Sequence, residues 1–227
     1  MIGDSTHRRG FLGRAAAGVV GALSVPRLLE ATSETMQGGD PDAWLAKLTA
    51  PHRCLFDAPQ HGSGLPQIHV YNYINTYQQA YKVPSTSINT VFTCYGPPGP
   101  ATMPIAWNDA MWAKYKVGEQ IGLKDSGGKF VTNNVFFRAK AGDPVLGNGA
   151  FAVAGLEGLQ KLGTTVLMCN NAFMMWVGHL AGKGLGTAAD IEKDIRANLV
   201  PGTVTVPAMV IAIEKAQSKG VAYNRQG

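Results

Sequence analysis

Residues 164–173 read TTVLMCNNAF, and this stretch decides the expected fold. The run from Thr164 to Cys169 is apolar and rich in β-branched residues, as in a buried strand, and Gly163 comes directly before it. Residues 172–180 follow with a composition typical of a helix. A strand that passes directly into a helix is characteristic of α/β proteins, in which such units repeat along the chain.

The same alternation continues on both sides of this stretch. We expect further strands at residues 52–57, 87–95 and 202–206, and further helices at residues 65–81, 108–121, 151–162, 188–199 and 207–219. Residues 44–48 fit a short amphipathic turn, and residues 124–146 are irregular with a possible short strand at 130–137. Alternating strands and helices imply right-handed crossovers. The pattern therefore predicts an α/β fold with a mostly parallel sheet and helices on both faces.

Composition limits the class of protein. Among 227 residues, 45% are apolar and only 15% are charged, which favours a globular chain with one well-buried core. The net charge of +5 is scattered, without the basic block or the aromatic and basic interleaving of a nucleic-acid surface, so nucleic acid is not expected as a partner. The glycine-rich segments at 147–149 and 182–186 have neither phosphate-loop nor dinucleotide-binding spacing. No cofactor is expected.

The N-terminal residues have the layout of an export signal. Arg8-Arg9-Gly10-Phe11-Leu12 precedes a weakly apolar stretch that is shorter than the about 20 residues needed to span a bilayer. This pattern resembles a twin-arginine (Tat) signal. We expect residues 1–31 to be that signal, 32–51 a linker and short helical lead-in, and 52–227 the domain. The protein would then be periplasmic or otherwise exported, and membrane-bound only if the signal is retained.

Cys169 is the main candidate for chemistry. Ligands of open parallel sheets bind at the carboxyl ends of the strands, where both Cys169 and Cys94 are expected to lie. A cysteine directly before a helix receives backbone N–H groups and the positive end of the helix dipole, which favour the reactive thiolate. Asn170 and Asn171 offer amide donors for an anion near the sulfur. A buried, inert cysteine that ends a strand fits the same pattern.

The other candidates are less specific. Cys94 is a resolving thiol, a disulfide partner of Cys169 or a packed side chain, and three cysteines exclude a complete disulfide framework. His61, in a glycine-containing loop after the first expected strand, is either a base or ligand at the same sheet edge or a solvated loop residue. The histidines and cysteines lack metal-ligand spacing, so no metal site is expected.

Two segments carry a resemblance to a known family. The block GTTVLMCNNAF and the closing stretch from Asn198 to Asn224, with CLFDAP and TVFTCYGP earlier, resemble the DsrE/DsrF-like (YchN-like) family over residues 52–224. The resemblance implies a DsrE-like three-layer sandwich, a last strand near the C-terminus and assembly into homo-oligomers. It also implies sulfane sulfur carried as a persulfide on Cys169. Tyr95 and Gly96, which follow Cys94, join the binding candidates.

Three functions remain open from the sequence. The first is binding or transfer of sulfane sulfur on Cys169, with a sulfur donor or acceptor that is a protein or a small compound of unknown identity. The second is a non-catalytic periplasmic binding or assembly module with an apolar pocket between subunits. The third is a thiol–disulfide redox protein that uses Cys94 and Cys169.

Overall fold

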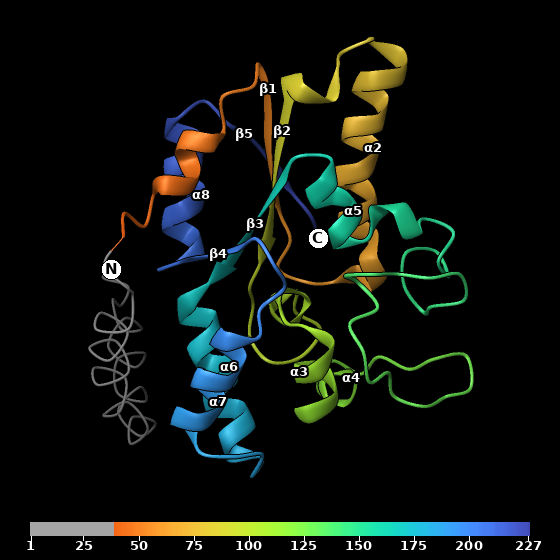
Figure 1. Cartoon of the computed structure of the whole chain (residues 1–227), viewed down its shortest axis with the longest axis vertical. Helices are drawn as coiled ribbons and strands as arrows, with labels where there is room; N and C mark the ends of the chain where they lie inside the picture. The colour runs from red at the N-terminus through yellow and green to blue at the C-terminus, as the bar shows by residue number, and fades with distance from the viewer. Residues whose placement is uncertain (1–38) are drawn as a thin grey trace, which may run out of the picture. The chain divides into compact units, whose positions relative to one another are not determined.

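The computed structural model describes residues 39–227, and a sheet of five parallel strands lies at the centre of this unit (Figure 1). The strands are β1 (His52–Asp57), β2 (Ile88–Cys94), β3 (Thr164–Cys169), β4 (Thr203–Val206) and β5 (Ala222–Arg225). Their order in the sheet is β4-β3-β2-β1-β5. The predicted α/β class is confirmed, and β5 is the last strand implied by the family resemblance. The expected signal at residues 1–31 lies outside the described residues.

Helices cover both faces of the sheet, as predicted. Four helices of ten or more residues are α2 (Leu65–Ala80), α6 (Asn170–Gly182), α7 (Ala188–Ala197) and α8 (Met209–Ser218), and α5 (Leu156–Lys161) has six. The short ones are η1 (Ala43–Lys47), η2 (Gly62–Gly64), η3 (Ser85–Ser87), η4 (Met103–Ala106), α3 (Asp109–Lys114), α4 (Val117–Gln120) and η5 (Ala152–Ala154). In Figure 1, α2 and α5 lie on one side of the sheet, and α8 and η1 lie on the other. This arrangement is that of a three-layer α/β sandwich.

The strand order explains why α8 is separated from α2. Strands β1 to β4 are added one after another in one direction, and the chain then returns from β4 across three strands to place β5 beside β1. Because right-handed crossovers in opposite directions lie on opposite faces of a sheet, the connection that contains α8 covers the face opposite α2. Trp44 of η1 is buried, and Lys215 of α8 pairs with Asp42, so the expected helical lead-in packs onto the domain.

Strand register decides which face each side chain takes. Cys54 is paired with Thr90, and Cys94 with Met168. Because successive side chains of a strand alternate between faces, Cys54 and Cys94 point to the α2 face. Cys169, one residue beyond Met168, points to the α8 face, and so does Asp57 at the end of β1. This division determines which groups can share a site.

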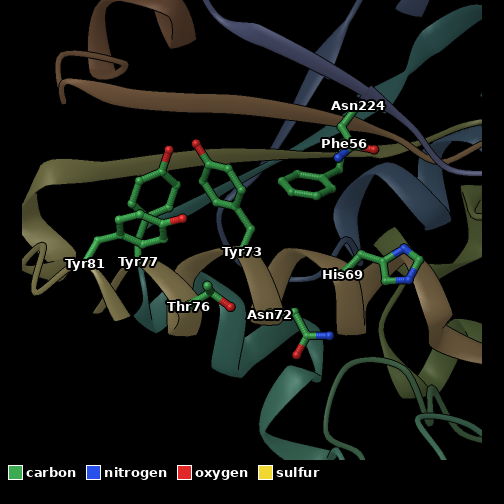
Figure 2. A pocket seen from close by; sticks show the side chains of 8 residues that line it. All are labelled: Phe56, His69, Asn72, Tyr73, Thr76, Tyr77, Tyr81 and Asn224. Carbon is green, nitrogen blue, oxygen red and sulfur yellow. The ribbon is translucent and has the colours of Figure 1, made fainter. Parts of the chain in front are cut away.

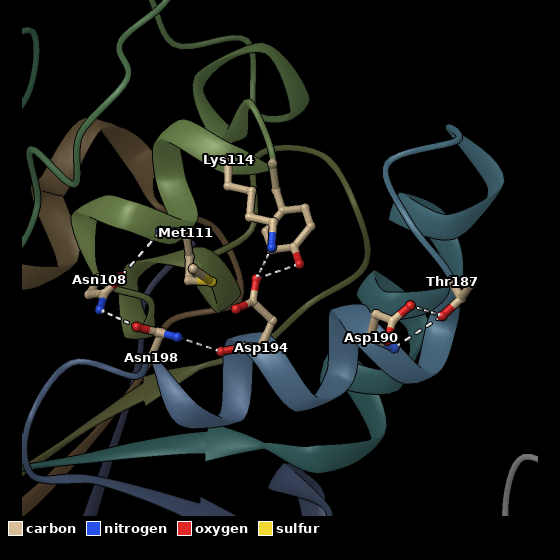
Figure 3. Close-up of polar contacts among 8 residues, drawn as sticks. Asn108, Met111, Lys114, Thr187, Asp190, Asp194 and Asn198 are labelled. Carbon is tan, nitrogen blue, oxygen red and sulfur yellow. Dashed lines mark hydrogen bonds and ion pairs between the residues drawn. The ribbon is translucent and has the colours of Figure 1, made fainter.

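Polar contacts join α7 to α3 near the carboxyl end of β3 (Figure 3). Asp194 accepts hydrogen bonds from Lys114 Nζ and Tyr115 Oη, each at 2.7 Å. Asn198 Oδ1 accepts from Asn108 Nδ2 at 3.1 Å, and Asn108 also caps α3. These bonds hold the two helices together at the edge of the sheet where the predicted site lies.

Three predicted elements differ in the structure. The helix expected at 108–121 is two short helices, because Lys116 adopts a left-handed conformation with φ of 50° between them. The helix expected at 151–162 is preceded by η5 and begins only at Leu156. The strand expected at 130–137 is absent from the described chain, where Phe130 makes a single bridge to Lys124 and the side chain of Asn134 is hydrogen-bonded to two backbone carbonyls.

The irregular segment 124–146 is anchored on the helices rather than on the thiol of Cys169. Gln67 of α2 donates to the carbonyl of Phe136 at 2.9 Å, and Gly118 of α4 lies so close to Val131 that a Cβ atom would be 2.2 Å from the Val131 oxygen. Asn134 N donates to Asp109 of α3 at 2.8 Å. The segment is therefore held by contacts with α2, α3 and α4.

Candidate functional site

Cys169 lies where two helices begin. Its sulfur accepts a hydrogen bond from the backbone N–H of Ala172 in α6, with an N···Sγ distance of 3.5 Å, and another from Met209 in α8, at 3.3 Å. The residue is buried, with 5% of its surface exposed. Two helix N-termini from different parts of the chain thus converge on one thiol.

The local sequence explains this convergence. Cys169 keeps the extended conformation of β3, with φ of −78° and ψ of 118°, and is the N-cap residue of α6. Ala208 is likewise extended, and α8 starts directly after it. Because β3 and β4 are neighbours and both end at the same edge, the helices that follow them begin side by side. Unpaired N–H groups and the positive ends of two helix dipoles are therefore directed at Sγ, which is an arrangement that accommodates negative charge.

Asn170 and Asn171 do not supply the expected side-chain donors. Asn170 is buried, and its Oδ1 accepts from Arg196 Nη2 of α7 at 2.7 Å. Asn171 is exposed, and its backbone N–H donates to Pro207 O at 3.3 Å. Each helical residue rotates the side-chain direction by about 100°, so residues of the first turn diverge from their cap. The groups that reach the sulfur are backbone amides.

Cys94 is not a neighbour of Cys169 on the same face. It is fully buried on the α2 face, and this burial raises the pKa of its thiol. Burial also raises the pKa of Cys54 to about 11. All three cysteines are free thiols in the structure. Of the alternatives that the sequence left open for Cys94, the disulfide with Cys169 is not formed, because the register of β2 and β3 directs the two side chains to opposite sides of the sheet.

Tyr95 is the residue of the β2 edge that shares a face with Cys169. Cys94 and Met168 are paired in register, and Tyr95 follows Cys94 as Cys169 follows Met168, so Tyr95 and Cys169 point to the same face. The Tyr95 hydroxyl donates to Asp57 Oδ1 at 2.6 Å, and Tyr223 of β5 donates to Asp57 Oδ2, also at 2.6 Å. Burial, followed by the bond to Asp57, raises the pKa of Tyr95. At the carboxyl edge of the sheet, Asp57 and the two tyrosines bonded to it therefore lie on the same face as Cys169.

Gly96 has a structural role in this edge. Its φ is +105°, and a Cβ atom would lie 2.7 Å from the Pro59 oxygen, so only glycine fits the turn. Its carbonyl accepts a hydrogen bond from Trp176 Nε1 at 3.0 Å. Because Trp176 is a buried residue of α6, this bond ties the helix that caps at Cys169 to the loop after β2.

His61 is buried rather than solvated. Its Nδ1 accepts from Ser63 N at 3.1 Å, and its ring lies against Phe136 with a centroid distance of 5.2 Å. Burial lowers the pKa of the imidazole below its ordinary value. The Nε2 atom has no hydrogen-bond partner within residues 39–227. The contacts of His61 are with η2, with the irregular segment and, through its backbone N–H, with Pro100 O at 2.9 Å, and none of its hydrogen bonds reaches Cys169.

Three contributors to the site were missed in the sequence. Met209 donates through its backbone and therefore leaves no side-chain signal. Arg196 holds Asn170 from α7, a contact that depends on tertiary packing. Asp57 did have a signal, because it is a carboxylate at the end of an apolar strand, in CLFD, where ligands of parallel sheets bind.

Comparison with protein-family models, with curated proteins and with solved structures found no match. Within residues 39–227, no three His, Cys, Asp or Glu side chains come together as a metal site would require. In the same part of the chain, no helix is both long and apolar enough to cross a bilayer. The site must accordingly be interpreted from its own geometry.

Proposed function

We propose that the protein binds or transfers sulfane sulfur as a persulfide on Cys169, in the manner of the DsrE-like family that its sequence resembles. The observation that carries the proposal is the pair of backbone N–H groups, from Ala172 and Met209, that donate to Sγ. A sulfur anion accepts hydrogen bonds more strongly than a neutral thiol. These two donors support the proposal, because both are in place at the sulfur in the protein without a substrate.

The reaction needs no oxidant. The Cys169 thiolate attacks the outer sulfur of a donor persulfide R–S–SH, the S–S bond of the donor breaks, and R–S⁻ leaves while Cys169 becomes Cys–S–SH. One S–S bond breaks and one forms, so the count of electrons is unchanged, and the proton remains on the transferred sulfur. The reverse attack by an acceptor thiolate on the outer sulfur of Cys169 releases the product and restores the thiolate.

Partial burial suits this intermediate. Cys169 is 5% exposed, whereas Cys94 is completely enclosed. A persulfide in bulk water exchanges with any thiol that it meets, and an enclosed one is open only to partners that fit the opening. We propose, as the sequence suggests, that the protein acts after export and as a homo-oligomer, with a donor and an acceptor that remain to be identified.

The test is to load the full chain with glutathione persulfide and measure its intact mass. We expect a gain of one sulfur atom that dithiothreitol removes, and peptide mapping should locate it on Cys169. Cys169→Ser should take up no sulfur, and Cys94→Ser, in which the fully buried thiol is replaced, should load like the wild type if it folds. Sulfur on Cys94 or Cys54 in the folded protein, or no uptake at any donor concentration, would refute the proposal.

A binding module is the second candidate, and one observation favours it. Val210 and Ile211, in the first turn of α8 next to the donor Met209, are 71% and 49% exposed. Apolar side chains in water beside a candidate site are typical of contact with a partner. In a pure binding module, Val210→Asp would abolish association while Cys169→Ser would leave it intact. Sedimentation of the two variants separates these functions.

A further inference from the structure

A groove lies on the face of the sheet opposite Cys169, between α2 and the edge formed by β1 and β5 (Figure 2). Its volume is about 460 Å³, within the range of about 300–1,000 Å³ for small-molecule sites. Phe56 of β1 forms part of its wall, and Asn224 of the edge strand lies at its border. Because it is open along α2, the groove can hold an extended ligand.

Three tyrosines form one side of the groove. Tyr73, Tyr77 and Tyr81 follow one another at four-residue spacing, so their rings line one face of α2 and its end. The ring centroids are 4.9 Å apart for Tyr73 and Tyr77 and 5.5 Å apart for Tyr77 and Tyr81. Figure 2 shows Tyr73 and Tyr77 rising from the helix toward the strands, with the ring of Tyr81 lying beside Tyr77. Tyr73 and Tyr77 are half-buried, and Tyr77 also packs on the ring of His52, with a centroid distance of 4.4 Å. Tyr81 is exposed, so its ring is the one most open to a ligand.

The polar groups of the groove are oriented by a hydrogen-bonded chain. The Oε1 atom of Gln226 is a carbonyl oxygen and can only accept a hydrogen bond. In its short contact with His69, the Nδ1 atom of His69 must therefore carry the hydrogen and donate it. Gln226 Nε2 donates to Asn224 Oδ1 at 2.7 Å. Asn224 therefore presents its amide N–H₂ as a free donor, and the Nε2 atom of His69 makes no hydrogen bond within residues 39–227. The groove offers both donors and acceptors in fixed positions.

Within residues 39–227, none of the residues that line the groove is Asp, Glu, Lys or Arg. Asn72 and Thr76 instead add an amide and a hydroxyl, both exposed, that make no hydrogen bond within residues 39–227. An anionic or cationic ligand would find no counter-charge here. The lining therefore favours a neutral ligand, with apolar faces for the tyrosine rings and hydroxyl edges for the amides.

We propose that this groove binds a neutral carbohydrate chain. Sugar rings have apolar C–H faces that stack on aromatic rings, and hydroxyl groups at their edges that both donate and accept. The exposed ring of Tyr81, held against Tyr77, would supply the stacking surface, while Asn72 and Asn224 would bond the hydroxyl groups. The proposal is independent of sulfur transfer, because the groove and Cys169 lie on opposite faces of the sheet.

The experiment uses the full chain and three neutral trisaccharides, which are maltotriose, cellotriose and chitotriose, each at millimolar concentration. Saturation-transfer NMR should detect binding of at least one, and calorimetry should give its Kd. Tyr81→Ala should raise that Kd at least tenfold, and Tyr81→Phe, which keeps the ring, should raise it less than threefold. Phe130→Ala is the matched control, because Phe130 is also an exposed aromatic residue but lies outside the groove, and its Kd should equal that of the wild type.

Three results would overturn the proposal. One is the absence of saturation transfer to all three trisaccharides in the folded protein. Another is binding that Tyr81→Ala leaves unchanged, which would place the ligand elsewhere. The third is binding of adenosine, a neutral planar probe, with no binding of any saccharide, which would assign the tyrosines to a heteroaromatic ligand. Tyr81 is 70% exposed, so its substitution should leave the fold intact, and circular dichroism would verify this.

Discussion

Replacing Met209 with proline should weaken the reactivity of Cys169 without removing the thiol. The N–H of Met209 donates to Sγ at 3.3 Å, and proline has no N–H to donate. Proline is accepted at the first position of a helix. The preceding Ala208 already has the extended conformation that a residue before proline prefers, with φ of −145° and ψ of 134°. Met209→Pro therefore deletes one donor and keeps the helix start.

The side chain of Met209 is buried, so its loss has an effect of its own. Met209→Ala is the matched control, because it also removes the packing, which contributes about 2–5 kcal/mol, but keeps the N–H. A hydrogen bond to a charged group contributes about 1.5–3 kcal/mol. At the lower end of this range, and with a factor of ten for each 1.4 kcal/mol, anionic sulfur becomes about tenfold less populated. The proline variant should be modified by a thiol reagent about tenfold more slowly than the alanine variant.

The assay is the rate of modification by methyl methanethiosulfonate at pH 7, with the label located by peptide mass spectrometry. Burial raises the pKa of the thiols of Cys54 and Cys94, so the label should appear first on Cys169. Equal rates in Met209→Pro and Met209→Ala would show that the α8 amide does not stabilise the sulfur anion. Protection of Cys169 at every pH at which the protein is folded would reject the reactive thiol itself.

Three further predictions concern stability, and urea unfolding measures each of them. Burial lowers the pKa of His61 from 6.5, so the unfolded chain binds a proton at this residue before the folded protein does as the pH falls. The free energy of unfolding should therefore decrease from pH 7 to pH 5. The decrease should be smaller in His61→Gln. Gly118→Ala should destabilise the fold by more than about 2 kcal/mol, because its Cβ atom would lie 2.2 Å from the Val131 oxygen, and an unchanged midpoint would contradict that packing. Trp176→Phe should lower the free energy of unfolding by about 1–3 kcal/mol, because the Gly96 carbonyl loses its donor. An unchanged free energy of unfolding would show that water replaces the indole N–H.

The fold was predictable where local signals agreed. The strand at 164–169 has the predicted bounds, because an apolar, β-branched run between Gly163 and a helix has one interpretation in an α/β chain. The segment 130–137 misled the prediction for a physical reason. Val131 and Phe136 are buried there, but by packing on α4 and α2, and burial of an irregular segment produces the same apolar residues as a strand.

The candidate site was predictable only in part. Position alone was enough to place Cys169 at the start of a helix on the carboxyl edge of the sheet. The face of the sheet to which Cys94 points was not predictable. It depends on whether Cys94 or Tyr95 lies beside Cys169 in the register of β2 and β3, and a shift of one residue reverses the face. A backbone donor such as Met209, which is 40 residues from the cysteine, has no side-chain signature at all.

The return of the chain from β4 to β5 therefore does more than complete the sheet. If β5 had been added beyond β4, the crossover would have continued in the direction of the earlier ones and α8 would lie on the α2 face. Cys169 would then have one helix N-terminus, that of α6, and the α8 face of its strand would be open to water. Because the chain instead returns to pair β5 with β1, the same connection brings the Met209 amide to the sulfur, partly encloses the thiol and positions Tyr223 to bond Asp57. The environment of the thiol is a consequence of topology, so a substitution that weakens the β1–β5 pairing should alter the reactivity of Cys169 from the far side of the sheet.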